Sequence, residues 1–317
     1  MTFLDQFMID VDLGLSGSPK SLSSKYFYDK RGSELFVEIM NLPEYYLSRS
    51  EMEIFTLQSD RLIELFEIQT DHHVELIELG PGDGRKILHL LLAMTEQKYD
   101  LSYFPVDISE DSLKQLEAML AKELPALSVR SHHGDYFDVL SSLKQRLHKK
   151  IVFFLGSNLG NYPDQQAADF VYQLGSNMHP GDILVLGLDL KKPSEQVLPA
   201  YNDKDGVTRD FNFNLLSRIN RELGANFSLD AFAHRPEYCE QTGVASSYLE
   251  SLADQQVSID KLAKTFQFQK GEKIQLEISR KYSDEVFNDI IAKSDFQIIG
   301  KVLDEKQYFA EYILCRE

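Results

Sequence analysis

The chain has 317 residues, of which 43% are hydrophobic and 26% charged, so it has the composition of a folded protein with room for one large domain or two unequal ones. Its formal charge of −17, from 33 basic and 50 acidic residues, opposes a role in nucleic-acid binding, because phosphate backbones usually meet a basic surface. The sequence has neither a signal peptide nor the roughly 20 consecutive apolar residues of a membrane span, so we expect a cytoplasmic protein without a membrane partner.

From Val74 onward, short apolar runs alternate with segments of helical periodicity, which is the pattern of a parallel sheet with crossover helices. Each apolar run is expected to be a strand, and each periodic segment a helix that covers the sheet. The expected strands are 74–79, 102–107, 127–133, 151–155 and 182–188, and the expected helices are 86–94, 109–120, 136–147 and 165–177. This alternation predicts a Rossmann-like, doubly wound α/β domain.

The rhythm changes after residue 190. A helical segment is expected within residues 199–232, followed by antiparallel strands at 246–252, 256–262 and 274–282. The chain closes with a helix, 284–293, and a hairpin of strands 297–303 and 308–314, an ending typical of class I methyltransferases. We expect residues 60–195 and 283–317 to form the methyltransferase domain. Residues 1–59 and 196–282 would form a second, smaller α+β substrate-binding domain.

A glycine-rich turn, Gly80-Pro81-Gly82-Asp83-Gly84, follows the first strand and opens a helix. In this context glycines let a ligand approach backbone amides at a helix N-terminus, although a tight turn without a ligand has the same residues. Asp107 ends the second strand, where a carboxylate can accept hydrogen bonds from both hydroxyls of a ribose. Asp135 and Tyr136 follow the third strand, where methyltransferases hold adenine; the alternative for Asp135 is a surface turn.

The same strand, turn and acidic residue would serve NAD or FAD, so the spacing of the glycines decides the cofactor class. The dinucleotide fingerprint G-x-G-x-x-G requires glycine at position 85, which is Arg85 here. The G-x-G-x-G spacing and the closing hairpin favour S-adenosylmethionine. No P-loop motif is present, and Cys239 and Cys315 stand in no metal-binding pattern, so no metal site is expected.

Motifs along nearly the whole chain carry a family resemblance. They include Lys25-Tyr26-Phe27-Tyr28-Asp29, Leu42-Pro43-Glu44-Tyr45-Tyr46 with Arg49, Leu155-Gly156-Ser157 through Asn161, Ala200-Tyr201-Asn202-Asp203, and Asn220-Arg221-Glu222-Leu223. In these segments the chain resembles the histidine-specific, S-adenosylmethionine-dependent methyltransferases that make trimethylhistidine on the way to ergothioneine.

The resemblance implies roles for individual residues. The donor would be held by Tyr28, Gly80, Lys86, Asp107, Asp135 and Tyr136, together with Gly82 of the glycine turn. The amino-acid substrate would be held by Tyr45, Asn161 and Tyr201, with Tyr45 and Asn161 as the catalytic pair that orients the amine. Glu277 and Ser279 would hold the imidazole. Ser247 aligns where the family usually has a methionine in the substrate pocket.

The expected activity is therefore N-methylation of the α-amino group of free L-histidine, giving up to trimethylhistidine (hercynine). Ser247 leaves open a different amino acid, such as a tryptophan derivative. A protein that binds S-adenosylmethionine without catalysis is the alternative from another class. The expected partner is a small molecule, and we expect a monomer, although the sequence contains no direct indication of the oligomeric state.

Overall fold

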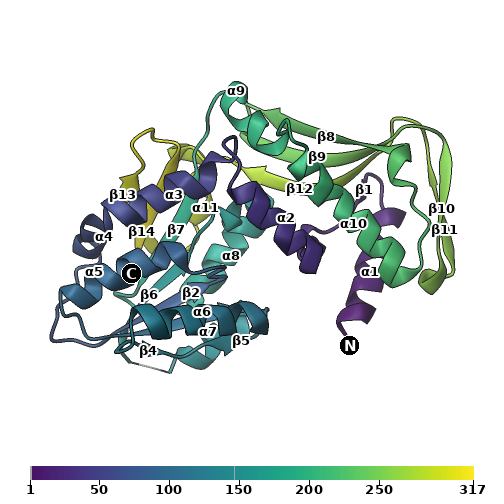
Figure 1. The fold of residues 1–317 in the computed structure, drawn as a ribbon. Coiled ribbons are helices and arrows are strands. Elements are labelled where there is room, and N and C mark those ends of the chain that lie inside the picture. Colours follow the sequence, from purple (N-terminus) through teal and green to yellow (C-terminus); the bar gives the residue numbers. More distant parts are fainter. Residues whose placement is uncertain (1, 146) are drawn as a thin grey trace. The chain divides into compact units, whose positions relative to one another are not determined.

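The computed structural model describes residues 2–145 and 147–317, and the chain divides into two compact units (Figure 1). Unit 1 consists of Met1–Tyr46 and Lys192–Ser279, and unit 2 of Leu47–Lys191 and Arg280–Glu317. The first boundary precedes the expected one between residues 59 and 60. It does so because helix α3 (Tyr46–Leu57) buries Ile54 and Phe55 in the core of unit 2.

Unit 2 is built on an eight-stranded sheet with the order β13-β14-β7-β6-β2-β3-β4, and β5 pairs with β3. Neighbouring strands from β4 and β5 through to β7 are parallel, whereas β14 is antiparallel to both β7 and β13. The doubly wound sheet with its closing hairpin is thus confirmed. The strands are β2 (Val74–Leu79), β3 (Leu101–Asp107), β4 (Ser128–Val129), β5 (His132–His133), β6 (Lys149–Phe154), β7 (Ile183–Asp189), β13 (Phe296–Leu303) and β14 (Phe309–Arg316).

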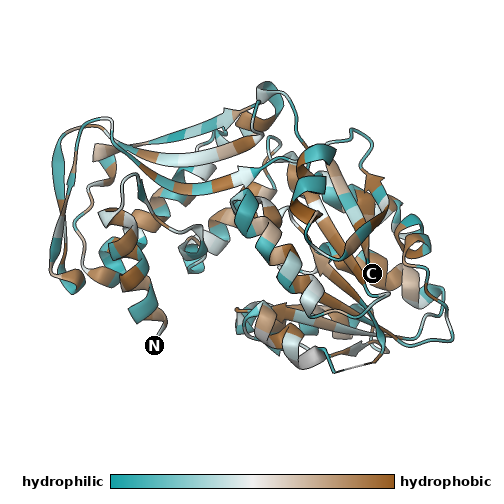
Figure 2. Cartoon of the chain, turned by 180° about the vertical axis from the view of Figure 1, so that it is seen from behind, coloured by the Kyte–Doolittle hydropathy of each residue, from teal (hydrophilic) through white to brown (hydrophobic). Residues whose placement is uncertain are grey.

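Helices cover both faces of this sheet, and each face has its own apolar core. Figure 2 shows the sheet strands hydrophobic along most of their length, as expected for strands buried on both sides. One face packs against α3, α4 (Ser59–Leu65), α5 (Arg85–Glu96) and α6 (Glu110–Glu123). The other packs against α7 (Tyr136–Leu143), α8 (Asp164–Ser176) and α11 (Asp284–Ile291). The expected helix 136–147 ends at Leu143, and residue 146 lies outside the described residues.

Unit 1 combines helices with a four-stranded sheet of order β1-β12-β9-β8 and a separate hairpin, β10-β11. Its core is formed by one side of the sheet, the hairpin and the long helix α10. The helices are α1 (Phe3–Ser16), α2 (Lys30–Met40), α9 (Ser194–Val197) and α10 (Val207–Leu223), with 3₁₀ turns η1 (Ser24–Tyr26), η3 (Leu198–Tyr201), η4 (Leu229–Ala231) and η5 (Asp260–Leu262). The strands are β1 (Lys20–Ser21), β8 (Phe232–Cys239), β9 (Val244–Ser251), β10 (Gln255–Ile259), β11 (Lys264–Phe268) and β12 (Lys273–Arg280).

Candidate functional site

The glycine turn joins β2 to α5 in unit 2, and its three glycines have different roles. Gly80, Gly82 and Gly84 all have positive φ angles, of 70°, 58° and 68°. A Cβ atom on Gly84 would lie 2.1 Å from Cδ1 of Leu116, so this glycine allows α5 to pack against α6. A Cβ atom on Gly82 would meet nothing within 4 Å. The turn therefore leaves open space at Gly82, which fits an approaching ligand, whereas the first amide of α5, that of Arg85, donates to the carboxylate of Asp83 at 3.1 Å.

Asp107 and Tyr136 lie beside this turn. A Cβ atom on Gly80 would be 2.8 Å from the hydroxyl of Tyr136, so the tyrosine lies directly against the glycine. Burial raises the pKa of Tyr136, and the negative charge of Asp107 raises it further, which places the two side chains near each other. Asp107 ends β3 and accepts the N–H of Ser109 at 2.8 Å. Asp135 is exposed and caps α7, accepting the N–H of Phe137 at 2.9 Å.

Lys86 lies in the first turn of α5 and forms an ion pair with Glu51 of α3. Glu51 is almost fully buried, and its second carboxylate oxygen accepts the N–H of Gly156 at 2.6 Å. Sequence reasoning does not identify Glu51. The available signal is that it follows Arg49 in a segment covered by the resemblance.

Asn161 ends a tightly held loop at the carboxyl end of β6. Gly156 and Ser157 have φ angles of 74° and 57°, and the 3₁₀ turn η2 (Asn158–Asn161) follows. The hydroxyl of Ser157 accepts the N–H of Asp189 at 3.0 Å. A Cβ atom on Gly160 would lie 2.7 Å from the carbonyl oxygen of Arg280. The loop is thus anchored on several sides, while Asn161 itself is exposed.

In the sheet of unit 1, the residues expected to hold the imidazole and Ser247 lie on different faces. Glu277 and Ser279 are two residues apart on β12, so they share one face of the sheet. Leu276, the residue before Glu277, faces the core together with Leu249 of β9, so Glu277 points to the other side of the sheet. Ser247 is two residues from Leu249 and is 1% exposed, so it also faces the core. The expected pocket residue Ser247 therefore lies on the opposite face of the sheet from Glu277.

Tyr248, the neighbour of Ser247, is on the face that carries Glu277. The ammonium of Lys273 lies 5.1 Å from the centre of the Tyr248 ring, and Lys273 is four residues before Glu277 on β12. Since alternate residues of a strand share a face, Tyr248 and Glu277 lie on the same side. A larger or smaller residue at position 248 would therefore affect this face more directly than a change at position 247.

The expected tyrosines of unit 1 lie around an aromatic cluster. The ring of Phe36 is 5.5 Å from that of Tyr28 and 6.3 Å from that of Tyr45, both in edge contact. Half of the surface of Tyr28 is exposed, yet desolvation at its hydroxyl raises the pKa, and the negative charge of Glu277 raises it further. Tyr201 is buried at the end of η3. The Phe36 ring thus contacts both Tyr28 and Tyr45, and the charge of Glu277 acts on the Tyr28 hydroxyl.

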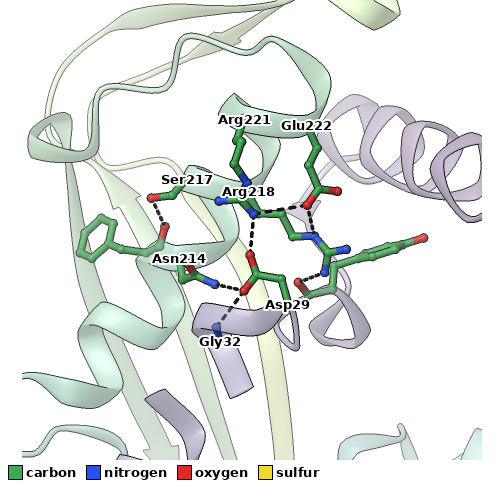
Figure 3. Close-up of polar contacts among 9 residues, drawn as sticks. Asp29, Gly32, Asn214, Ser217, Arg218, Arg221 and Glu222 are labelled. Atoms are coloured by element: carbon green, nitrogen blue, oxygen red, sulfur yellow. Dashed lines mark hydrogen bonds and ion pairs between the residues drawn. The ribbon is translucent and has the colours of Figure 1, made fainter. Parts of the chain in front are cut away.

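Asp29 fixes the segment that carries Tyr28 (Figure 3). Its carboxylate caps α2 by accepting the N–H of Gly32 at 2.8 Å, and it also accepts hydrogen bonds from Asn214 at 2.8 Å and Arg221 at 2.6 Å, both on α10. Burial would raise the pKa of Asp29, but these hydrogen bonds and the positive charge of Arg221 outweigh burial and hold the pKa below its usual value.

Asp29→Asn is expected to lower the free energy of unfolding by about 1 kcal/mol at pH 7, because asparagine still caps a helix but loses the charge that pairs with Arg221. A depressed pKa means that the contribution of Asp29 is complete above its unfolded pKa of about 3.9 and is lost as the pH falls through the lower folded value. Urea denaturation of both proteins at a series of pH values should show the difference shrinking toward pH 3. A difference that is constant with pH would contradict this role for the charge.

A family model described as histidine-specific methyltransferase, SAM-dependent, matches residues 7–316. The chain belongs to this family. A histidine N-alpha-methyltransferase of Mycolicibacterium smegmatis is 36% identical over 87% of this chain and 84% of its own length. Ergothioneine biosynthesis protein 1 of Schizosaccharomyces pombe is 30% identical over 93% of this chain and 39% of its own length. A 4-dimethylallyltryptophan N-methyltransferase of Claviceps fusiformis is 27% identical over 59% of this chain and 55% of its own length.

The methyltransferase carries its expected donor residues mainly on unit 2, which has the Rossmann-like class I fold and brings Gly80, Asp107 and Tyr136 together. Tyr28 is the exception, because it belongs to unit 1. Among residues 2–145 and 147–317, no helix is long and apolar enough to cross a membrane. In the same residues, no group of three histidine, cysteine, aspartate or glutamate side chains could hold a metal ion.

Proposed function

We propose that this methyltransferase transfers methyl groups from S-adenosylmethionine to the α-amino group of free L-histidine, giving up to trimethylhistidine. The observation that carries the proposal is the placement of Glu277 and Ser279 on one face of β12, near Tyr28, in a chain of the histidine-specific family. A neutral imidazole can donate its N–H to a carboxylate and accept a hydrogen bond from a hydroxyl at its second ring nitrogen, whereas an indole has one N–H donor and no nitrogen acceptor.

S-adenosylmethionine supplies an electrophilic methyl group when bound, so the protein needs chiefly to orient a neutral amine. We infer that Asn161 and the hydroxyl of Tyr45 do this, and that Tyr201 contributes to holding the amino acid. The pKa of a peptide's α-amino group is about 8 and that of a free amino acid is higher, so a small fraction of neutral amine is present near pH 7 without a dedicated base. Alignment of reacting groups can lower a barrier by about 7–11 kcal/mol in favourable intramolecular models.

The geometry of unit 2 supports a set of proposed contacts with the methyl donor. Asp107 would accept hydrogen bonds from the ribose hydroxyls, and the open space at Gly82 would admit the ligand to the glycine turn. Tyr136 and Asp135 would hold adenine. Lys86 would act from the first turn of α5, where its ammonium is already held by Glu51.

A tryptophan derivative is the second candidate substrate, and Ser247 was the residue that favoured it. Because the Ser247 side chain faces the core of unit 1, it gives no specific support for a larger pocket. Glu277 is therefore the better guide to specificity. Turnover of histidine would also exclude the remaining alternative, a protein that binds the donor without catalysis.

Glu277→Ala is expected to lower kcat/KM for histidine. The corresponding loss of transition-state stabilisation should be about 1.5–3 kcal/mol, the range for a hydrogen bond to a charged group. A tryptophan-type substrate should lose little. Glu250→Ala is the matched control, because Glu250 is a carboxylate on the neighbouring strand β9 that pairs with Arg235 at 3.0 Å. Steady-state kinetics with both substrates tests the proposal. Histidine turnover that is the same in Glu277→Ala and Glu250→Ala would reject the role of Glu277.

A further inference from the structure

A buried carboxylate of unit 2, Glu51, contacts both a donor-binding candidate and the loop that ends at Asn161. Its Oε2 atom pairs with the ammonium of Lys86, and its Oε1 atom accepts the N–H of Gly156 at 2.6 Å. Gly156 opens the left-handed turn that leads through η2 to Asn161. One side chain thus connects the first turn of α5 with the loop after β6.

The backbone of β7 makes room for this carboxylate. A Cβ atom on Gly187 would lie 2.5 Å from Oε1 of Glu51 and 3.1 Å from Oε1 of Glu311, which is opposite Gly187 on β14. A larger residue at position 187 would displace the Glu51 oxygen that holds Gly156. The close approach of two carboxyl groups to one glycine also requires that they not both be charged.

Burial and neighbouring charges shift the pKa values of the ionisable groups around Glu51. Burial raises the pKa of Glu311 well above its usual value, and the negative charge of Glu51 raises it further, so both effects favour the neutral form of Glu311. Burial also raises the pKa of Glu78 to about 7, against a hydrogen bond from Tyr103 and the positive charge of Lys86. Burial alone would lower the pKa of Lys86, but Glu51 reverses this and raises it. Among these groups, Lys86 and Glu51 form the ion pair.

We propose that Glu51 is a positioning residue that sets the ammonium of Lys86 and the Gly156–Asn161 loop together. The proposal rests on the proposed function, in which Lys86 contacts the donor and Asn161 orients the amine. The ammonium of Lys86 has three N–H groups. Glu51 accepts one of them, so the other N–H groups can bind the methyl donor. In-line methyl transfer is sensitive to alignment, so a side chain that fixes both groups contributes to the chemical step without contacting it.

The test compares Glu51→Gln with Glu53→Gln, a control on the same helix whose carboxylate accepts the N–H of Glu305 at 2.7 Å. Calorimetry gives the affinity for S-adenosylhomocysteine, and kinetics gives kcat with both substrates saturating. Glu51→Gln should weaken binding by about tenfold or more and should also lower kcat by about tenfold or more, as for loss of a buried charged partner. Glu53→Gln should change neither. Lys86→Met should weaken binding by a similar factor, because it removes the same ion pair from the other side.

A double variant separates the two contacts. In the Lys86→Met background, Glu51→Gln should cost no further affinity but should still lower kcat. An unchanged kcat in folded Glu51→Gln would overturn the proposal. So would a double variant whose loss of affinity equals the sum of the losses in Lys86→Met and Glu51→Gln. If Glu51→Gln does not fold, Gly187→Ala displaces the same oxygen while keeping the charge, and an unchanged kcat in that folded variant would overturn it equally. Failure of the wild type to methylate histidine would reject histidine as the substrate but not the role of Glu51. The binding measurements need no turnover, and kcat can be measured with whichever amine the wild type methylates.

Discussion

Replacing Lys281 with methionine is expected to lower the free energy of unfolding by about 3–5 kcal/mol, the cost of breaking a buried ion pair. The ammonium of Lys281 lies 2.7 Å from the carboxylate of Asp189, and both side chains are 0% exposed. Methionine extends as far as the Cε atom of lysine but lacks the ammonium, so the carboxylate of Asp189 stays buried with its ion pair removed. The backbone N–H of Asp189 donates to Ser157, so the pair also supports the loop that ends at Asn161.

Urea denaturation of Lys281→Met should be compared with that of Lys301→Met. Lys301 pairs with Asp284 at 2.6 Å, but the Asp284 side chain is two-thirds exposed, so this control should lose less than about 1 kcal/mol. Adding Asp189→Asn to Lys281→Met should restore part of the stability, because the uncompensated charge is removed. Equal losses in the two lysine variants would show that burial of the Lys281 pair does not have the expected effect.

Asp107→Ala is expected to weaken binding of S-adenosylhomocysteine by about 1.5–3 kcal/mol, or roughly 10- to 150-fold. The ribose hydroxyls would lose a charged acceptor that β3 holds at the edge of the sheet beside the glycine turn. Calorimetry measures the loss directly, and the same change should appear for S-adenosylmethionine.

The matched control for this experiment is Asp111→Ala, which removes an exposed carboxylate from the first turn of α6. Asp111→Ala should change the affinity for S-adenosylhomocysteine by less than about twofold, because the charge of an exposed carboxylate is screened by solvent and salt. Asp107→Asn should retain more affinity than Asp107→Ala, since an amide oxygen still accepts a hydrogen bond. Similar affinities for wild type and Asp107→Ala would mean that the ribose does not contact Asp107.

The strands of unit 2 could be predicted closely because a strand buried on both faces appears as a continuous apolar run. Strand β2 has the predicted bounds, and β3, β6 and β7 begin and end within two residues of theirs. The predicted strand 127–133 is instead two short strands, β4 and β5, because the segment lies at the edge of the sheet and contains the polar pair Arg130-Ser131. Edge strands have less apolar surface to bury, so their pattern is weaker.

Unit 1 was harder to predict for the same reason. Strand β8 lies at the edge of its sheet and contains Arg235 and Pro236, which are tolerated there but remove the apolar pattern. Strand β11 buries only Phe266 and Phe268 against the core. Neither strand was predicted, although their hairpin partners β9 and β10 were.

The candidate site shows a similar division. Gly80 and Asp107 could be recognised because they follow apolar strands, so their position in the fold is visible in the local sequence. Glu51 could not, because its partner Lys86 is 35 residues away and a buried ion pair leaves no local pattern. The orientation of Ser247 depends on which face of β9 meets the core, and a shift of one residue in the alignment exchanges the faces.

We propose free L-histidine as the substrate, and a panel of free amino acids distinguishes it from the indole amines. The wild-type protein is incubated with isotopically labelled S-adenosylmethionine and a panel of free amino acids that includes histidine, tryptophan and 4-dimethylallyltryptophan, and the products are identified by mass spectrometry. We predict methylation of the α-amino group of histidine, with up to three methyl groups, and little transfer to the indole amines. Preferential methylation of an indole amine, with histidine left unmodified, would contradict the claim.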